Sequence, residues 1–425
     1  MQKLDVVLGL QWGDEGKGKI VDVLTPDYNV VARFQGGPNA GHSIYFGDKS
    51  FVLHTVPSGI FRPDTRNIIG NGVVIDPIIL MEEIHAIEKM GIDVRSNLFI
   101  SKRAHLILPT HRLLDAASEK AKGDKKVGTT GKGIGPAYTD KIARNGLRVG
   151  DLLRPDFRER YDALAADHLA GLQLESTVDH TEWLNAVREL TDTLRDNIVD
   201  GEIIINKWLQ EGKTILAEGA QGSLLDVDFG SYPYVTSSST LCAGACTGLG
   251  VAPAHIGKVY GIFKAYCTRV GAGPFPTELE DETGDRLRQL GHEYGATTGR
   301  PRRCGWLDLV ALKHTIMLNA ATSLIMMKSD VLDGFETVKV CVAYKTDDGT
   351  MLDYFPLYAD EQNLTPVYKE FSGWCSDTTS CRTYEELPEQ LKEYIEFIER
   401  ETGVPVDIIS VGPDRSNTII REEKH

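Results

Sequence analysis

Long hydrophobic runs, paired cysteines and an excess of positive charge are all missing from this 425-residue chain. No stretch approaches the ~20 apolar residues that a membrane-spanning helix needs, and the apolar stretch before Gln11 is too short for a signal peptide. The formal net charge of −15 argues against general binding to nucleic acid or anionic membranes, because phosphate backbones need a basic face. We therefore expect a cytoplasmic protein that holds anionic ligands with local cations.

The seven cysteines form no C-x-x-C pair. No histidine follows Cys242 and Cys246, or Cys375 and Cys381, at a spacing typical of zinc ligands. This pattern favours inert thiols in a reducing cytosol over a zinc site.

The length allows two or three domains, but no low-complexity linker marks a boundary. We therefore expect a single α/β domain with insertions over residues 1–425.

Short runs rich in valine, isoleucine and leucine alternate with segments of helical periodicity. This alternation predicts a large, mostly parallel central β-sheet with helices on both faces. Strands are expected over 6–10, 28–34, 68–70, 98–100, 215–217, 259–266, 323–327, 338–344 and 407–411, and helices over 17–24, 77–90 and 306–319. Two insertions are expected. One is a basic, glycine-rich active-site loop over 119–148, and the other is a helical segment over 156–211 with two or three amphipathic helices.

A phosphate-binding type of loop directly follows the first predicted strand. Gly13-Asp14-Glu15-Gly16-Lys17-Gly18-Lys19 matches the spacing G-x-x-x-x-G-K, but Ile20 stands where a serine or threonine would hold Mg²⁺. The carboxylates of Asp14 and Glu15 compete with a phosphate for the backbone N–H groups of a helix N-terminus. That conflict eases if a carboxylate holds the metal or acts as a base. The loop therefore predicts phosphate chemistry beyond nucleotide storage.

Two further glycine-rich blocks suit anionic ligands. Gly36–His42 follows the second predicted strand and so lies at the same carboxyl edge of a parallel sheet. His42 has the chemistry to donate to a phosphate or a leaving oxygen, although a loop histidine with a satisfied hydrogen bond is the alternative. The run Gly128–Pro136, surrounded by lysines and arginines, has the composition to fold over an anion; a solvated basic loop is the alternative.

Two weaker motifs lie in the second half of the chain. Lys328-Ser329-Asp330 follows a hydrophobic strand, as the guanine-reading element of GTP-binding proteins does, and Ser410-Val411-Gly412 follows another. A bare K-x-D pattern also occurs in solvated turns, and such a turn is the alternative to a guanine site. The segment 295–303 places Arg300, Arg302 and Arg303 beside a threonine–glycine turn, where guanidinium groups suit carboxylates or phosphates.

Taken together, these blocks resemble the adenylosuccinate synthetase family. The likeness rests on residues 11–19, 37–42, 128–136, 218–222, 232–236 and 297–308, and it extends to 410–413. The resemblance implies a ligase that forms adenylosuccinate from IMP and L-aspartate in AMP biosynthesis. GTP would be cleaved to GDP and phosphate through a 6-phosphoryl-IMP intermediate. It also implies Mg²⁺ held by Asp14 and the Gly41 carbonyl, and a homodimer in which Arg144 reaches IMP across the interface.

The resemblance further implies roles for individual residues. Asp14 would remove the N1 proton of IMP, His42 would act as general acid toward GDP, and Gln221 would complete the catalytic set. The GTP contacts would be Gly13, Glu15, Gly16, Lys17, Gly18, Lys19, Gly41, His42, Arg302, Lys328, Asp330, Ser410 and Gly412. The IMP contacts would be Asp14, Lys17, Asn39, His42, Thr130, Arg144, Gln221, Thr236 and Arg300. The L-aspartate contacts would be Ala296, Thr297, Thr298, Gly299, Arg300 and Arg302.

Two other classes of protein share part of this pattern. A regulatory GTPase switch would also use a phosphate loop and Lys328 with Asp330, but it would keep a serine or threonine after the loop lysine. It would also have no need of Gln221 or the arginines of 300–303. A nucleotide-binding structural module is the third possibility.

This sequence departs from the family pattern at Met327 and Ser329, where threonine and leucine are common in the family. The base-reading lysine and aspartate remain.

Overall fold

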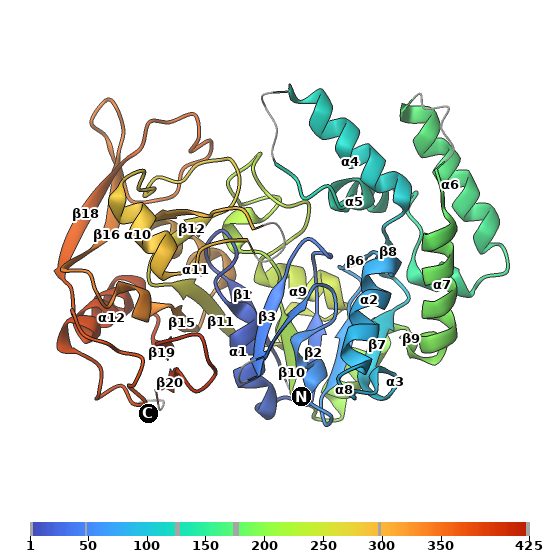
Figure 1. The fold of residues 1–425 in the computed structure, drawn as a ribbon, viewed down its shortest axis with the longest axis horizontal. Helices are drawn as coiled ribbons and strands as arrows, with labels where there is room; N and C mark the ends of the chain where they lie inside the picture. Colours follow the sequence, from blue (N-terminus) through green and yellow to red (C-terminus); the bar gives the residue numbers. More distant parts are fainter. Residues whose placement is uncertain (1–2, 47–48, 124–127, 173–177, 296–298, 422–425) are drawn as a thin grey trace.

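The first predicted strand lies near the centre of a ten-stranded sheet in the order β20-β19-β15-β11-β1-β10-β2-β5-β7-β9 (Figure 1). The computed structural model describes residues 3–421 except for 47–48, 124–127, 173–177 and 296–298. The strands are β1 (Leu4–Gly9), β2 (Val30–Arg33), β5 (Arg66–Ile69), β7 (Leu98–Ser101), β9 (Ile198–Val199), β10 (Ile215–Glu218), β11 (Ile256–Lys264), β15 (Ser323–Met327), β19 (Val406–Ser410) and β20 (Thr418–Ile420). All neighbours are parallel except β19 and β20, so the predicted mostly parallel sheet is confirmed.

Helices cover both faces of this sheet. Successive β1 side chains point to opposite faces, so Val6 packs in one core cluster and Val7 in another. The cluster around Val7 includes residues of α1 (Lys17–Leu24). The cluster around Val6 includes residues of α8 (Gly201–Gln210), α9 (Cys242–Leu249), α11 (Leu309–Asn319) and α12 (Glu389–Thr402). Burial on both faces explains the nearly continuous apolar strands.

Smaller sheets extend this core. The expected strand over 338–344 is β16 (Thr337–Lys345), which pairs with β14 (Leu307–Asp308), β17 (Met351–Leu352) and β18 (Thr365–Ser372) outside the central sheet. The other pairs are β3 (His42–Phe46) with β4 (Lys49–Leu53), β6 (Val74–Ile75) with β8 (His105–Leu106), and β12 (Cys267–Arg269) with β13 (Arg303–Gly305). The helix expected over 306–319 starts later, at Leu309, because the Asp308 side chain caps it by accepting from Ala311 N–H.

The prediction of a loop over 119–148 was wrong for much of that range. Helix α4 (Pro109–Ala121) enters it, and α5 (Ile134–Ala143) occupies its second half. Gly133, with φ of +73°, caps α5 instead of disrupting it. Gly135 and Pro136 fall in the first turn, where backbone N–H groups have no partner within the helix. Tyr138 then fixes α5 to the core by donating to the Gly72 carbonyl.

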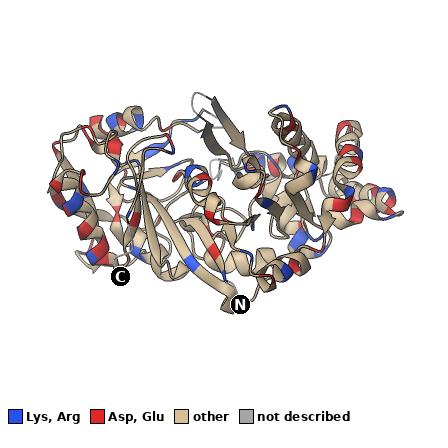
Figure 2. Ribbon diagram, turned by 90° about the horizontal axis from the view of Figure 1, so that it is seen from below, with Lys and Arg blue, Asp and Glu red and all other residues tan. Residues whose placement is uncertain are grey.

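The helical segment over 156–211 is confirmed. It contains α6 (Phe157–Leu172), α7 (Thr181–Leu194) and α8. The remaining helices are α2 (Pro77–Glu88), α3 (Val94–Asn97) and α10 (Glu282–Leu290). Figure 2 shows that Lys, Arg, Asp and Glu positions lie mainly on the outer helices. Within the described part of the chain, no helix has both the length and the apolar character to cross a bilayer. The single-domain organisation over 1–425 stays a prediction.

Candidate functional site

The candidate site lies along one edge of the central sheet, where the carboxyl ends of neighbouring strands meet (Figure 1). The predicted motif 13–19 follows β1, 36–42 follows β2, 219–222 follows β10, 328–330 follows β15 and 411–412 follows β19. These strands are adjacent in the sheet, with only β11 among them. Five motifs that are far apart in the sequence therefore meet where open α/β sheets bind ligands.

Glu15 organises the first loop from the inside. Its side chain is fully buried. The carboxylate accepts hydrogen bonds from the backbone N–H groups of Gln11 (3.1 Å) and Gly13 (2.9 Å) and from Lys17 Nζ (2.7 Å). Gly9 leaves the necessary space, since a Cβ there would lie 2.2 Å from Glu15 Oε2. Glu15 therefore fixes the shape of the loop, and its contact with GTP stays a prediction.

Lys19 holds a different position from the lysine of an ordinary phosphate loop. Its Nζ donates to Ser410 Oγ (2.7 Å), the Gly412 carbonyl (2.7 Å) and the Asn417 carbonyl (3.2 Å). Burial lowers the pKa of Lys19 to about 8, while Asp330 raises it. Lys19 therefore connects the loop after β1 with the segment after β19, and both belong to the predicted GTP site.

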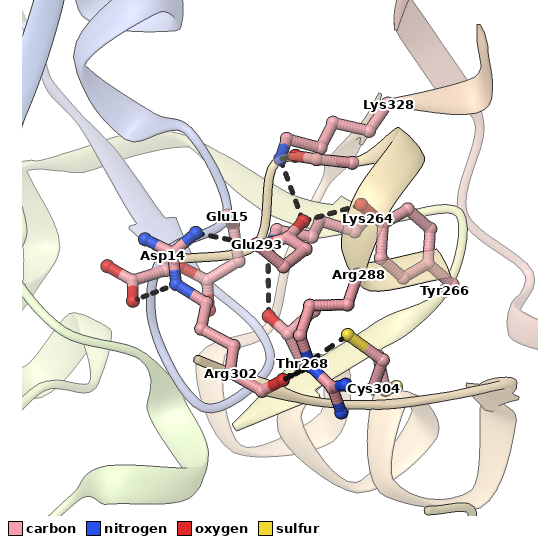
Figure 3. A network of polar contacts seen from close by, with 12 residues as sticks. Asp14, Glu15, Lys264, Tyr266, Thr268, Arg288, Glu293, Arg302, Cys304 and Lys328 are labelled. Atoms are coloured by element: carbon pink, nitrogen blue, oxygen red, sulfur yellow. Dashed lines mark hydrogen bonds and ion pairs between the residues drawn. The ribbon is translucent and has the colours of Figure 1, made fainter. Parts of the chain in front are cut away.

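Asp14 meets an arginine from a distant part of the chain (Figure 3). Its side chain is 40% exposed, and its Oδ2 accepts from Arg302 Nε at 2.8 Å. The Nη1 group of Arg302 donates to the buried carboxylate of Glu293 at 2.7 Å. The structure thus brings two predicted site residues, Asp14 and Arg302, into direct contact.

His42 is buried and oriented by a carboxylate. Its Nδ1 donates to Glu218 Oε1 at 2.7 Å, and Glu218 also accepts from Ser58 N–H at 2.8 Å. Burial lowers the pKa of His42, whereas Glu218 raises it. Among the described residues, His42 Nε2 has no hydrogen-bond partner although it is buried. A polar atom left unpaired inside a protein points to a ligand that is bound there.

Gln221 belongs to a chain of hydrogen-bonded amides. It adopts a left-handed backbone conformation with φ of +56°. Its Oε1 accepts from Gln35 Nε2 (3.0 Å), and its Nε2 donates to Asn39 Oδ1 (3.3 Å). Gln35 also donates to Ser238 Oγ, which lies 3.5 Å from Thr236 Oγ1. The structure therefore connects three predicted IMP contacts, Asn39, Gln221 and Thr236, through Gln35 and Ser238.

The segments after β15 and β19, which carry the predicted base contacts, lie side by side. Ser329 Oγ donates to the Ser410 carbonyl at 3.1 Å, which joins the two segments. The Oδ1 atom of Asp330 is buried without a hydrogen-bond partner in the described structure. Burial raises the pKa of Asp330. An unpaired carboxylate oxygen suits a base edge that presents N–H donors, as guanine does.

Helix α5 and the basic segment before it contact the second glycine-rich loop. Lys132 Nζ donates to the Pro38 carbonyl at 2.8 Å, and Tyr138 Oη accepts from Gly36 N–H at 3.0 Å. Thr130 is exposed on the segment before α5. Arg144 caps the other end of the helix and lines a surface cavity of about 250 Å³. The cavity is also lined by Lys141, Arg148, Arg160, Asp151, His105 and Gly146.

The predicted L-aspartate segment is only partly placed. Ala296, Thr297 and Thr298 lie outside the described residues. Gly299 and Arg300 are exposed at the end of this segment. Arg303, which the sequence grouped with Arg300 and Arg302, instead forms an ion pair with Glu278 and donates to the Gly273 carbonyl. Arg303 is therefore a structural residue in the described conformation.

Three partners of site residues were missed by the sequence analysis, namely Glu218, Glu293 and Gln35. Glu218 ends a strand, Glu293 follows a helix, and Gln35 precedes the second glycine-rich block. Position at a strand end and membership of the block 218–222 were the available signals for Glu218. Their partners lie up to 203 positions away in the sequence, so only the fold reveals these contacts.

One cluster with metal-binding residue types lies outside this edge. His111, Asp140 and His168 are its members, and it is the one group of three such side chains found among the described residues. His111 Nδ1 accepts from Leu108 N–H at 2.9 Å, so the neutral ring carries its proton on Nε2 and donates it to Asp140. A protonated Nε2 cannot bind a metal. The cluster therefore acts as hydrogen-bonded support for α4, α5 and α6.

Comparison with known proteins gives consistent results. The family model "Adenylosuccinate synthetase" matches residues 6–419. Adenylosuccinate synthetase of Parabacteroides distasonis is 60% identical over 424 residues, which cover 99% of each chain. The enzyme of the same name from Porphyromonas gingivalis is 59% identical over 428 residues and covers 99% of this chain and 100% of that protein.

Solved structures are similar as well. Fully ligated adenylosuccinate synthetase from Plasmodium falciparum superposes with a TM-score of 0.95 and 41% identity, covering 99% of this chain and 100% of the other. Cyanophage S-2L succinoaminodeoxyadenylate synthetase has a TM-score of 0.63 and 21% identity, with coverage of 99% and 95%. The second likeness shows a shared fold.

Proposed function

The chain belongs to the adenylosuccinate synthetase family, and from this premise we propose how residues at the sheet edge divide the reaction. The protein is a GTP-dependent ligase that joins IMP to L-aspartate in AMP biosynthesis. A regulatory GTPase switch, the alternative reading of the loop, is not favoured by the family match. The C6 oxygen of IMP is a poor leaving group, so phosphorylation by GTP prepares it for displacement by the amine of L-aspartate.

Asp14 removes the N1 proton of IMP, which makes the C6 oxygen nucleophilic toward the γ-phosphate. His42, in its doubly protonated form, keeps Nδ1–H on Glu218 and donates from Nε2 to the GDP leaving group, and Gln221 holds the IMP base. The buried, unpaired Nε2 of His42 is the observation that carries this assignment, because Glu218 holds the ring through Nδ1 at the edge where the loop of Asp14 lies. A general acid that is fixed in place contributes about 10²–10⁴-fold to rate.

The other ligands are assigned by position along the edge. Guanine binds Asp330 and Lys328, with Ser410 and Gly412 beside them, and L-aspartate binds the 296–302 segment with Arg302. IMP binds along Asn39, Thr130, Gln221, Thr236 and Arg300. Gly13, Gly16, Lys17 and Gly18 contact GTP. Arg144 completes a partner's site in a homodimer, which agrees with its place in a basic cavity at the end of α5. A cytoplasmic location agrees with the seven free cysteines.

Mg²⁺ is the expected cofactor, and the donor set fits it. Arg302 occupies Oδ2 of Asp14, so Oδ1 is left for another partner. The Gly41 carbonyl supplies a second oxygen, and Mg²⁺ prefers oxygen ligands and substrate phosphates. When bound, Mg²⁺ spreads the negative charge of the transferring phosphoryl group. Asp14 and the carbonyl of Gly41 would hold it.

The activity is tested by omitting each substrate in turn. Phosphate release from GTP is expected to require both IMP and L-aspartate, and adenylosuccinate is expected to form in equal amount. Phosphate release is measured with a coupled assay, and adenylosuccinate by chromatography. GTP hydrolysis that is indifferent to IMP and L-aspartate would rule out the ligase.

Replacing Glu218 by glutamine is expected to lower kcat by about 10-fold to 100-fold, because orientation of a general acid accounts for part of its effect. The amide keeps the volume but presents a mixed donor and acceptor to His42 Nδ1 and Ser58. KM for IMP and L-aspartate should change little. Steady-state kinetics measure both, and Glu189→Gln, which breaks the exposed contact with His85, is the matched control. A kcat equal to that of the control would contradict the orienting role.

A further inference from the structure

Glu293 is a buried carboxylate that touches two residues assigned to ligands, although it contacts no substrate in the assignment above (Figure 3). Its side chain is fully buried. Lys328 Nζ donates to its Oε1 at 2.7 Å, and Arg302 Nη1 donates to its Oε2 at 2.7 Å. The buried Lys264 Nζ donates to both oxygens, at 2.9 and 3.0 Å. One carboxylate therefore joins the guanine end of the site to the L-aspartate end.

The backbone fixes Glu293 at the base of the L-aspartate segment. Arg302 N–H donates to the Glu293 carbonyl at 2.9 Å, and Glu293 N–H donates to the Arg288 carbonyl at 2.9 Å. Just beyond this pair, Gly295 N–H donates to the Arg300 carbonyl at 2.8 Å. Arg302 is thus joined to Glu293 through both main chain and side chain.

The negative charge of Glu293 offsets the repulsion among the three cations that surround it. Burial raises the pKa of Glu293, but Lys264, Lys328 and Arg302 lower it below the usual range, so the group stays ionised. Without this negative charge, three cations would face one another in a poorly hydrated place. Lys328, whose side chain is 30% exposed, has room to turn away toward solvent. Arg302 would keep Asp14 as its only carboxylate among the partners found here.

We propose that Glu293 is a positioning residue that couples GTP binding to L-aspartate binding. Guanine contact fixes Lys328, Lys328 fixes Glu293, and Glu293 fixes Arg302 in the position that receives the L-aspartate carboxylate. Coupling between two sites is reciprocal, so each ligand strengthens binding of the other by the same factor. The inference rests on the assignment of Lys328 to guanine and Arg302 to L-aspartate.

The test compares the wild type with Glu293→Gln by calorimetry. L-aspartate is titrated into protein with Mg²⁺ and IMP, with and without GDP, which has no γ-phosphate and cannot react. In the wild type, GDP is expected to tighten L-aspartate binding about fivefold or more. In Glu293→Gln the factor should fall to near one. KM for GTP and for L-aspartate should each rise about tenfold, while KM for IMP stays within about threefold.

A second variant separates positioning from stability. Glu293→Gln leaves Lys264 buried without its counter-ion, so Glu293→Gln with Lys264→Met removes that charge and is expected to recover Tm but not the coupling. Glu278→Gln, which breaks the nearby ion pair with Arg303, is the matched control and should keep the coupling. A wild-type factor near one would overturn the proposal, as would full coupling in Glu293→Gln or recovered coupling in the double variant. Failure of the ligase assignment itself would instead appear in the substrate-omission assay of the wild type.

Discussion

Replacing Asp14 by asparagine is expected to lower kcat by about 10³-fold or more, because removal of a general base alone costs about 10²–10⁴-fold. Asparagine has nearly the same volume but cannot take a proton from N1 of IMP. It is also a weaker ligand for Mg²⁺ than a carboxylate. Activity is measured at saturating GTP, IMP and L-aspartate.

The fold should survive this change. Asp14 has φ of +58°, and asparagine tolerates the left-handed region better than most residues. The lost ion pair with Arg302 involves a partly exposed carboxylate, and Arg302 keeps its bond to Glu293. Tm and the affinity for IMP should therefore stay close to the wild type, as in the control Asp64→Asn on an exposed turn. A kcat within tenfold of the wild type would contradict the role of Asp14 as base.

Mixing two inactive variants is expected to restore activity. Arg144→Leu should lower kcat/KM for IMP by about 100-fold, because a guanidinium–phosphate pair is a strong charge-assisted contact. In a dimer of one Arg144→Leu subunit and one Asp14→Asn subunit, one site receives intact copies of both residues. Random mixing gives heterodimers as half of the population, so recovery should approach about 25% of wild-type activity.

The measurement needs verified heterodimers. Two affinity tags allow their purification after mild dissociation and reassociation, and activity is then read per dimer. Arg154→Leu, which removes an exposed arginine near the same cavity, is the control for surface charge. Heterodimers as inactive as their parents would show that Arg144 acts within its own subunit or not at all.

The sequence predicted which loops meet at the edge of the sheet better than it predicted the side-chain contacts between those loops. Motifs such as 13–19 and 328–330 stand directly after apolar strands, and parallel strands bring their carboxyl ends together. That reasoning located the loops of Asp14 and His42 at one edge without a structure. The sequence also predicts that a loop carboxylate replaces the hydroxyl missing at Ile20 as metal ligand, and this stays a prediction.

Other features could not be predicted from the sequence because they depend on tertiary packing. Lys264 lies at the end of an apolar strand, and nothing local shows that it needs the carboxylate of Glu293. Glycine density around Gly133 suggested a loop, whereas this glycine starts α5 by adopting φ of +73°. Glu15 looked like a surplus acid beside a phosphate site, but the backbone N–H groups of Gln11 and Gly13 are its partners.

The contacts of Lys19 determine when the site can be completed during synthesis of the chain. Its Nζ contacts Ser410, which is 391 positions later in the chain. Contacts this distant in sequence form slowly, because the loop between them must be closed first. At about 5–20 residues per second, the ribosome needs at least about 20 seconds between the two residues. The loop of Asp14 is thus made early but gains its contact with Ser410 only when almost all of the sheet has been synthesised.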